Sequence, residues 1–367
     1  MAMDLRVVIA GGGTGGHLYP GLAVARALIA RVPAAAVSFA GTSRGIEATV
    51  VPREGFELDV IRSGGLKGKS IAGWTRGVTL LPMSLVDAWR ILTRRRPHLV
   101  IGVGGYSSGP VVLTAASRGI PTMLLEQNAA PGLTNRLLAR VVKAAAVTYE
   151  STTAYFGSKA FVSGNPVRAE FFGGVDLHSL ERDHAAPSGV GVLIFGGSQG
   201  AHAINMAMVE AAARLVRSAQ PLRITHQTGE RDLDTVRAAY AAVGMAADVE
   251  PFLYDMARRI ADADLVVCRA GATTLAELTA AGKPSILVPL PTATDDHQRK
   301  NAELLAQAGA AEVVAQSERL GADLAERITT LAGDAGRRRQ MSTAARRLAR
   351  PDAARIVVDR ALQLVSQ

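Results

Sequence analysis

The sequence predicts an α/β protein made of two doubly wound parallel sheets, and three observations support this fold class. From Leu5 to about Pro166, short apolar strands alternate with helical stretches, which is typical of a parallel sheet covered on both faces. A strand, a glycine-rich loop and a helix open the first half at Leu5, and the same pattern opens the second half at Gly191. A length of 367 residues suits two domains of ordinary size.

The expected elements follow from the apolar runs between turn residues. In the first half we expect strands at 6–10, 36–40, 57–61, 99–102, 122–125, 145–147 and 160–162, with helices near 22–31, 45–53, 73–95, 108–118 and 135–141. In the second half we expect strands at 191–195, 222–227, 248–251, 265–268, 285–288 and 312–314, with a helix from the second glycine loop to Arg217.

The domain boundary is expected at the turn Gly164-Asn165-Pro166. The last helix, from Pro351 to Val365, has no obvious partner in a completed second domain, so we expect it to return to the first. The predicted N-terminal domain therefore spans residues 1–166 and 350–367, and the predicted C-terminal domain spans residues 167–349.

The composition indicates a cytosolic globular chain. Hydrophobic residues make up 48% of it, but no run of 18 apolar residues exists that would span a bilayer. The first apolar stretch breaks at Gly11, too early for a signal peptide. The single cysteine, Cys268, excludes an intrachain disulfide and any multi-cysteine metal site.

The net charge of +9 is partly concentrated between Arg62 and Arg96, where eight cations face one anion, Asp87. Apolar residues alternate with these cations at helical spacing, and both tryptophans of the chain are among them. Basic residues beside tryptophan and leucine suit the surface of an anionic membrane, whereas tryptophan at helical spacing also suits a protein core. Both interpretations stay open; the candidate membrane face consists of Trp74, Leu81, Leu85, Trp89 and Arg90.

The first glycine loop, Gly11 to His17, lies between a strand and a helix, where N–H groups and the helix dipole favour an anion. Its G-x-G-x-x-G spacing also fits a dinucleotide site, but that site needs an acidic residue at the end of the second strand. That strand is followed by Gly41-Thr42-Ser43-Arg44, which argues against a dinucleotide. The imidazole of His17 is the best candidate for a general base near neutral pH.

Other loops after strands carry further candidate residues. Thr274 and Glu277 have the spacing of a capping box, so capping is one explanation for both and ribose binding by Glu277 is the other. Asp295-Asp296-His297 permits a metal site, but helix capping is the favoured explanation. Asp232-Leu233-Asp234 resembles the D-x-D of metal-dependent sugar transferases, and we interpret it as capping and surface.

Seven loop motifs, spread from residue 11 to about residue 302, resemble those of the MurG family of bacterial peptidoglycan glycosyltransferases. They are GGTGGH, GGYSSGP, EQN, GNPVR, GGSQGA, CRAGATTLAEL, and DDHQ followed by NA, and they occur in the family's order. The resemblance implies the GT-B fold, in which two Rossmann-like domains face a deep interdomain cleft. It also implies inverting transfer of GlcNAc from UDP-GlcNAc to the 4-hydroxyl of the MurNAc of lipid I, giving lipid II, with no cofactor and no bound metal.

Carried over by motif, the resemblance assigns the donor mainly to the second half. There Ser198 would contact the diphosphate, Glu277 the ribose hydroxyls and Gln298 the GlcNAc hydroxyls. The full expected donor set is Thr14, Gly15, Gly16, Asn128, Arg168, Ser198, Leu253, Ala272, Thr273, Thr274, Leu275, Ala276, Glu277 and Gln298. N–H groups at a helix N-terminus, together with a hydroxyl or guanidinium, would then stabilise the leaving UDP in place of a metal ion.

The resemblance assigns the acceptor, lipid I, to the first half. The expected acceptor residues are Gly13, His17, Gly105, Tyr106 and Glu126, with His17 as the catalytic base. Because lipid I is bound to the membrane, the resemblance favours the membrane interpretation of the basic stretch and a peripheral position on the cytoplasmic side of the cell membrane. Other cell-wall synthesis proteins are further candidate partners.

Two other function classes are weighed against this one. A different GT-B enzyme, such as a UDP-GlcNAc epimerase or a glycolipid transferase, would share the donor pocket, but the EQN and GGYSSGP loops argue against it. A nucleic-acid-binding protein would need aromatic platforms or a recognition helix beside its basic residues, and only 4% of the residues are aromatic. We therefore expect no nucleic-acid partner.

Overall fold

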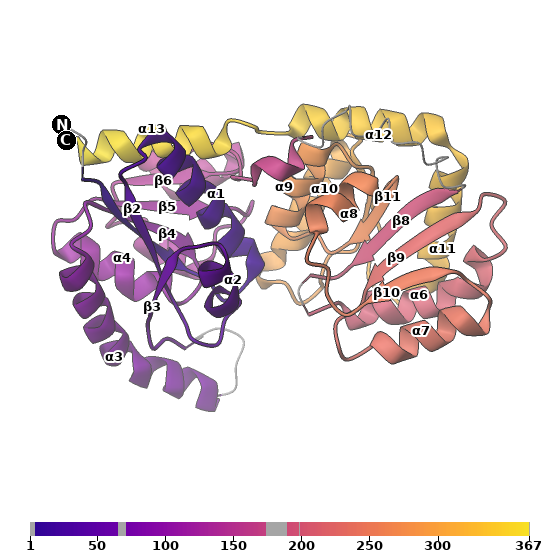
Figure 1. The fold of residues 1–367 in the computed structure, drawn as a ribbon, viewed down its shortest axis with the longest axis horizontal. Coiled ribbons are helices and arrows are strands. Elements are labelled where there is room, and N and C mark those ends of the chain that lie inside the picture. Colours follow the sequence, from indigo (N-terminus) through magenta and orange to yellow (C-terminus); the bar gives the residue numbers. More distant parts are fainter. Residues whose placement is uncertain (1–3, 65–70, 174–188, 198, 367) are drawn as a thin grey trace. The chain divides into compact units, whose positions relative to one another are not determined.

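A computed structural model describes residues 4–64, 71–173, 189–197 and 199–366, and for residues 71–79 it describes the backbone alone. The chain divides into two compact units (Figure 1). Unit 1 contains residues 1–168 and 350–367, and unit 2 contains residues 169–349. The division falls two residues after the turn at Gly164-Asn165-Pro166.

Unit 1 is built on a parallel sheet of seven strands in the order β3-β2-β1-β4-β5-β6-β7. Every described strand pair in it is parallel. The prediction of a doubly wound parallel sheet is therefore confirmed. The strands are β1 (Arg6–Gly11), β2 (Ala36–Gly41), β3 (Glu57–Val60), β4 (Leu99–Gly104), β5 (Thr122–Glu126), β6 (Ala144–Val147) and β7 (Ala160–Val162).

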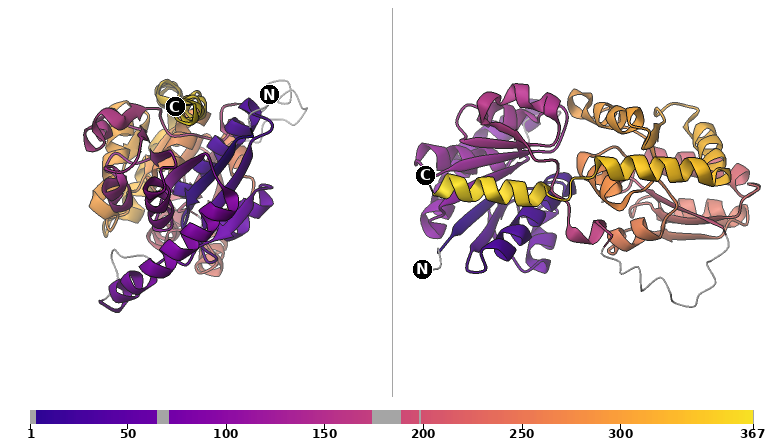
Figure 2. Two further views of the ribbon diagram at one scale, coloured as in Figure 1. Left: turned by 90° about the vertical axis from the view of Figure 1, so that its left-hand side faces the viewer. Right: turned by 90° about the horizontal axis from the view of Figure 1, so that it is seen from above.

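Helices cover both faces of this sheet. On one face, a core that includes Leu22 and Val357 joins the sheet to α1 (Gly15–Arg31), α2 (Glu47–Arg53) and α13 (Ala353–Val365). On the other, a core that includes Leu92 joins it to α3 (Ile71–Arg95), α4 (Ser108–Ser117) and α5 (Leu133–Leu138). Figure 2 shows the last helix, α13, lying along unit 1, where it packs on α1.

The start of α1 differs from the expectation. The predicted helix begins at Leu22, whereas the observed helix begins at Gly15 and contains Pro20. Glycine and proline both lower helix propensity, which is why the sequence favoured a later start. Leu18 is fully buried in the core below, and this packing outweighs the local preference. As a result, His17 lies in the first turn of a helix.

Unit 2 repeats the plan with six parallel strands in the order β10-β9-β8-β11-β12-β13. The strands are β8 (Val190–Phe195), β9 (Leu222–Gln227), β10 (Ala247–Glu250), β11 (Leu265–Cys268), β12 (Ser285–Leu287) and β13 (Ala311–Val313). The helices are α6 (His202–Leu215), α7 (Leu233–Ala242), α8 (Met256–Asp262), α9 (Ala272–Ala281), α10 (His297–Gln307), α11 (Leu320–Gly333) and α12 (Ala335–Leu348).

The chain leaves and re-enters unit 1 at neighbouring points. Gly164 has a φ of +80°, and a Cβ built on it would lie 2.6 Å from the Cβ of Arg350. The two segments therefore touch at a position where no side chain fits on the first. This contact fixes α13 close to the point where the chain passes to unit 2.

Candidate functional site

Three loops of unit 1 converge because their strands are neighbours. Strand β4 pairs with β1 on one side and with β5 on the other, so the residues after these strands lie along one edge of the sheet. The loops are Gly11–Thr14, Gly104–Ser107 and Glu126–Asn128, and the expected acceptor residues lie in them or in the first turn of α1. Loops at the carboxyl ends of parallel strands are the usual place for a ligand in such folds.

The His17 imidazole is held on two sides. Its Nδ1 lies 3.1 Å from the hydroxyl Oγ1 of Thr14, the residue that precedes α1. Its Cδ2 would lie only 2.6 Å from a Cβ built on Gly104, and its Nε2 3.0 Å away. Gly104 has a φ of +101°, a backbone conformation that L residues rarely adopt, and its missing side chain leaves the room that the ring fills. The Gly104–Ser107 loop therefore sets the position of the candidate base.

The two glycine loops also touch through their backbones. A Cβ on Gly105 would lie 2.6 Å from the carbonyl oxygen of Gly12, and a Cβ on Gly11 would overlap the backbone of Gly104. The glycines of both loops thus serve close packing of one loop on the other. The neighbouring Tyr106 side chain is exposed.

Glu126 is fully engaged by its own loop. One carboxylate oxygen accepts the N–H of Asn128 at 2.9 Å, and the other accepts the N–H of Gly132 at 3.0 Å and the amide of Asn135 at 2.9 Å. Burial raises the pKa of Glu126, although these hydrogen bonds oppose the shift. The carboxylate therefore holds Asn128 in place, and any effect of Glu126 on a ligand is expected to act through that loop.

A carboxylate that the sequence analysis did not single out lies beneath the first glycine loop. Glu47, the first residue of α2, is 0% exposed and accepts the Gly13 N–H at 2.7 Å. It also accepts the N–H and the hydroxyl of Thr42, both at 2.8 Å. The expected anion cradle at this loop is therefore already filled in part by a carboxylate of the protein itself. The available signal was the pair of glycines, Gly41 and Gly45, that precede it in the sequence.

Arg168 lies in unit 1, although the motif assigned it to the donor and the predicted second domain. Its guanidinium carbon is 4.5 Å from the centre of the Tyr19 ring, on α1. A guanidinium stacked on an aromatic face keeps its N–H groups at the ring edge, where they can still reach an anion.

In unit 2, the glycine loop between β8 and α6 packs on the loop after β9. A Cβ on Gly200 would overlap the Thr228 carbonyl group, and a Cβ on Gly229 would overlap the Gln199 carbonyl. This contact shapes the segment between β8 and α6 to which the diphosphate was assigned. The assigned residue itself, Ser198, lies outside the described residues.

Asp232 corrects the interpretation of Asp232-Leu233-Asp234 as capping and surface. Its side chain is buried, makes no capping hydrogen bond to α7, and contacts the His202 Nδ1 at 2.9 Å and the Asn205 amide at 2.8 Å. Although burial opposes the shift, these hydrogen bonds hold the pKa of Asp232 below its usual range. Asp232 therefore joins α7 to the start of α6.

The start of α9 corrects the capping-box explanation for Thr274 and Glu277. The helix begins at Ala272, and the residue before it, Gly271, has the extended backbone of an N-cap. Thr274 and Glu277 are therefore inside the helix, too late in it to be its N-cap and N3 residues. The segment Ala272–Leu275 forms the first turn, whose N–H groups point out of the helix end, and Glu277 is buried one turn further on.

Cys268, at the end of β11, is buried below this turn. Burial raises the pKa of its thiol far above the usual value, and the nearby Glu277 carboxylate adds to the shift. The thiol therefore stays protonated at neutral pH and does not act as a nucleophile.

Gln298 and Leu253, the remaining expected donor residues, have defined positions. The Gln298 side-chain oxygen accepts the Leu290 N–H at 3.0 Å. Leu253 is buried in the loop after β10. The residues just before Gln298, Asp295 and Asp296, have φ of +53° and +54°, so this turn is strained.

Neither explanation for the Asp295-Asp296-His297 segment describes what these side chains do. Among the described residues, no group of three or more histidine, cysteine, aspartate or glutamate side chains is placed to hold a metal. Asp296 precedes α10 but makes no side-chain capping bond, and it pairs instead with Arg299. Capping is therefore also wrong for this residue.

The described part of the candidate membrane face is on the surface of unit 1. Trp89 is 55% exposed, Leu81 and Arg90 are exposed, and Leu85 is partly buried. The guanidinium of Arg118, at the end of α4, lies 4.6 Å from the Trp89 ring centre. A core role is therefore wrong for Trp89, whereas the side chain of Trp74 lies outside the described residues.

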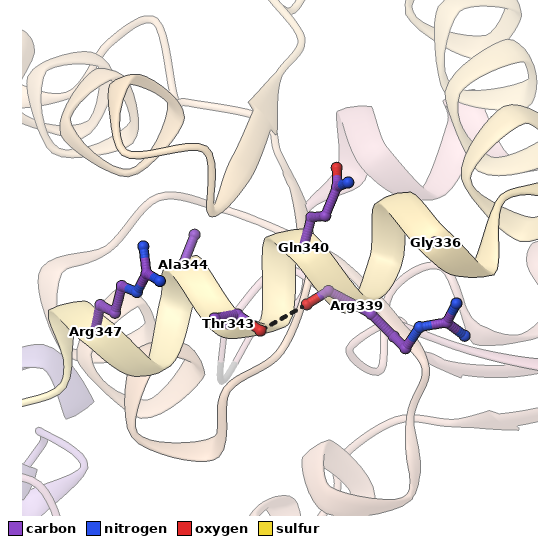
Figure 3. A pocket seen from close by; sticks show the side chains of 6 residues that line it. All are labelled: Gly336, Arg339, Gln340, Thr343, Ala344 and Arg347. Atoms are coloured by element: carbon purple, nitrogen blue, oxygen red, sulfur yellow. Dashed lines mark hydrogen bonds between the residues drawn. The ribbon is translucent and has the colours of Figure 1, made fainter.

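A shallow hollow in unit 2 lies apart from all the expected residues. Figure 3 shows that α12 alone lines it, with Gln340 and Arg347 on one side of the helix and Arg339 pointing away. The Thr343 hydroxyl donates to the Arg339 carbonyl oxygen, as serine and threonine hydroxyls commonly do within helices. The residues that line this hollow all come from α12, so no described side chain of another element contributes a functional group to it.

Two family models match the chain. The N-terminal domain model of glycosyltransferase family 28 matches residues 7–147, and the C-terminal domain model of the same family matches residues 191–357. The fold and these matches define the chain as a glycosyltransferase of family 28 with the GT-B fold.

Curated relatives narrow the assignment. A protein of Anaeromyxobacter sp. (strain K), 49% identical over 98% of this chain and 93% of its own length, is named UDP-N-acetylglucosamine–N-acetylmuramyl-(pentapeptide) pyrophosphoryl-undecaprenol N-acetylglucosamine transferase. A Myxococcus xanthus protein of the same name is 45% identical over 99% of this chain and 94% of its own. The chain belongs to this family, the MurG transferases.

Solved structures agree with this assignment. The MurG structure of Acinetobacter baumannii superposes with a TM-score of 0.76 and 32% identity, over 98% of this chain and 99% of that one. A UDP-GlcNAc 2-epimerase from Neisseria meningitidis reaches a TM-score of 0.67 over 98% of this chain and 100% of that one. At 15% identity, the epimerase shares the fold alone. Among the described residues, no helix is both long and apolar enough to cross a membrane.

Proposed function

We propose that this chain transfers N-acetylglucosamine from UDP-GlcNAc to lipid I, giving lipid II for peptidoglycan synthesis. The observation that carries the proposal is the identity of 45–49% over nearly the whole length of relatives with that activity in their name. A distant fold match would leave the acceptor undefined, whereas these matches extend over both units, including the loops of unit 1 that the resemblance assigns to the acceptor.

Unit 2 is proposed to hold the donor. The first turn of α9 offers N–H groups and the positive end of a helix dipole, which suit a diphosphate. Glu277, buried on the same helix, is proposed to accept hydrogen bonds from the ribose hydroxyls, and Gln298 to bind the GlcNAc hydroxyls. Ser198 and Arg168 are proposed to add a hydroxyl and a guanidinium to the charge that develops on the leaving UDP.

Unit 1 is proposed to hold the acceptor, with His17 as the general base. The acceptor hydroxyl oxygen forms a bond to the anomeric carbon while the bond from that carbon to the UDP oxygen breaks, and UDP leaves with the electron pair. His17 Nε2 takes the hydroxyl proton in the same step. For Nε2 to accept a proton, Nδ1 must carry a hydrogen and donate it to the Thr14 hydroxyl, 3.1 Å away. Attack opposite the leaving group inverts the anomeric configuration.

We also propose that unit 1 docks on the cytoplasmic face of an anionic membrane through α3. Leu81, Val86 and Trp89 are exposed on this helix, among the basic residues Arg90 and Arg94. Exposed apolar side chains with cations around them bind the boundary between lipid headgroups and acyl chains. This surface would bring the enzyme to its lipid-linked acceptor, and other proteins of cell-wall synthesis could meet it there.

The test is an incubation of the purified chain with UDP-GlcNAc labelled in the sugar and a short-chain lipid I analogue. The proposal predicts label in the lipid product and release of one UDP for each transfer. Epimerisation or hydrolysis of UDP-GlcNAc without the acceptor would instead assign the chain to another activity of the same fold. His17→Ala is the matched variant: it should lower turnover strongly and leave the affinity for UDP-GlcNAc unchanged, and unchanged turnover would eliminate His17 as the base.

A further inference from the structure

Glu47 lies outside every motif of the site, yet it is the carboxylate most closely associated with the first glycine loop. Its side chain is completely buried, and charged side chains are rarely buried without partners. Here the partners are three donors: the Gly13 N–H, the Thr42 N–H and the Thr42 hydroxyl. Two of the three come from the backbone, so the carboxylate fixes the path of the main chain.

The space for this carboxylate is created by missing side chains. A Cβ on Gly41 would lie 2.6 Å from the Glu47 Cγ, and a Cβ on Gly12 or on Gly45 would overlap the carboxylate group. Three glycines from two loops therefore surround Glu47. The missing side chains therefore leave the room that the buried Glu47 side chain occupies.

From Glu47, a short chain of contacts leads to the candidate base. Gly13, whose N–H Glu47 accepts, is followed directly by Thr14, and the carbonyl of Thr14 accepts the N–H groups of His17 and Leu18 at 3.2 Å each. The Thr14 hydroxyl contacts the His17 Nδ1. Without the bond to Glu47, the Gly13 N–H would lose this partner, immediately before Thr14.

We infer that Glu47 is a positioning residue for His17: it holds the Gly13 amide, and through it Thr14, so that the imidazole keeps the orientation needed to accept a proton. The inference rests on the proposed function, because it assigns His17 the role of base. It also has a consequence for the acceptor. While Glu47 holds the Gly13 N–H, an acceptor phosphate cannot take this group, so the acceptor diphosphate must be bound by other donors.

The test compares Glu47→Gln with a matched variant, Asp59→Asn. Asp59 is another buried carboxylate of unit 1, but it lies on β3 and pairs with Arg94 and Arg95. In Glu47→Gln, one carboxylate oxygen becomes an amide NH2 group, which in either orientation faces a backbone N–H, that of Gly13 or that of Thr42, donor against donor. We expect kcat to fall about 100-fold because the base is misplaced, with a much smaller rise in KM for UDP-GlcNAc, since Thr14 is also an expected donor residue. Asp59→Asn should leave both constants near those of the wild type.

Hydrogen–deuterium exchange supplies a readout that does not depend on turnover. Glu47→Gln should speed exchange in the peptide that covers residues 11–17, and Asp59→Asn should not. If Glu47→Gln does not fold, Glu47→Asp takes its place, because it keeps the charge and withdraws the carboxylate by one methylene; it should show the same effects in weaker form.

The inference is overturned if the folded variant keeps the wild-type kcat and exchange, or if Asp59→Asn loses as much kcat as Glu47→Gln does. These failures differ from failure of the proposed function. If the wild-type chain itself transfers no sugar to lipid I, the proposed function fails, while the exchange experiment still decides whether Glu47 orders the loop.

Discussion

The substitution Gly104→Ala tests how the Gly104–Ser107 loop sets the position of the base. A Cβ on Gly104 would lie 2.6 Å from the His17 Cδ2 and 3.0 Å from its Nε2. The nearest atoms belong to a side chain that can rotate, so the ring will give way before the backbone does. The added methyl group is therefore expected to move His17 and leave the fold intact.

The size of the effect follows from these distances. To reach ordinary van der Waals contact, the ring must retreat by about 0.8 Å. A misplacement of about 1 Å in a reacting group can lower the rate ~100-fold, which corresponds to about 2.7 kcal/mol in the activation barrier. The φ of +101° adds a backbone cost of about 1–2 kcal/mol in the free energy of unfolding.

Gly119→Ala is the control that separates the two costs. Gly119 follows α4 in the same unit with a φ of +72°, and a Cβ built on it would meet nothing within 4 Å. Both variants should lose similar free energy of unfolding in urea, but only Gly104→Ala should lose turnover of lipid I. The affinity for UDP-GlcNAc should change in neither. Equal kcat values for the two variants would refute the claim that Gly104 sets the place of His17.

Three further predictions concern the donor, the membrane and pH. Glu277→Ala should weaken UDP binding measured by calorimetry; an unaltered affinity would remove Glu277 from the ribose site. The double variant Leu81→Ser with Trp89→Ser should bind anionic vesicles less tightly at an unchanged Tm, because Trp89 is 55% exposed; unchanged vesicle binding would rule out this face. Burial lowers the pKa of His226 to about 3. Below about pH 6.5, the unfolded chain therefore binds a proton that the folded chain does not, so the free energy of unfolding decreases as the pH is lowered. From pH 7 to pH 5 the wild type should lose about 2 kcal/mol more free energy of unfolding than His226→Gln, and an equal loss would contradict the burial of a neutral imidazole.

The sheets could be predicted from the sequence because their strands are short, buried apolar runs separated by turn residues. The placement of the glycine loops at the carboxyl ends of strands could also be predicted, since each loop directly follows such an apolar run. The resemblance then supplied roles that no spacing rule gives, such as the assignment of Gln298 to the sugar. Helix starts were less predictable: α1 begins at Gly15 because the buried Leu18 outweighs two unfavourable residue types.

The errors at the site have two physical causes: buried polar contacts depend on residues distant in the sequence, and the first residue of a helix is not fixed by local spacing. Asp232 looked like a surface residue at a helix start, but it contacts His202, 30 residues away. Thr274 and Glu277 matched a capping pattern, but α9 begins at Ala272. Glu47 carried no motif at all, and only the fold shows that three glycines clear a space for its carboxylate.

The central claim is that an acceptor hydroxyl displaces UDP directly from the donor sugar, and analysis of the product linkage by NMR tests it most directly. After reaction of UDP-GlcNAc with a lipid I analogue, we predict a single product with GlcNAc joined in the β configuration to the 4-hydroxyl of MurNAc. An α linkage would contradict attack opposite the leaving group. Free GlcNAc or its 2-epimer, with the acceptor unchanged, would contradict the transfer itself.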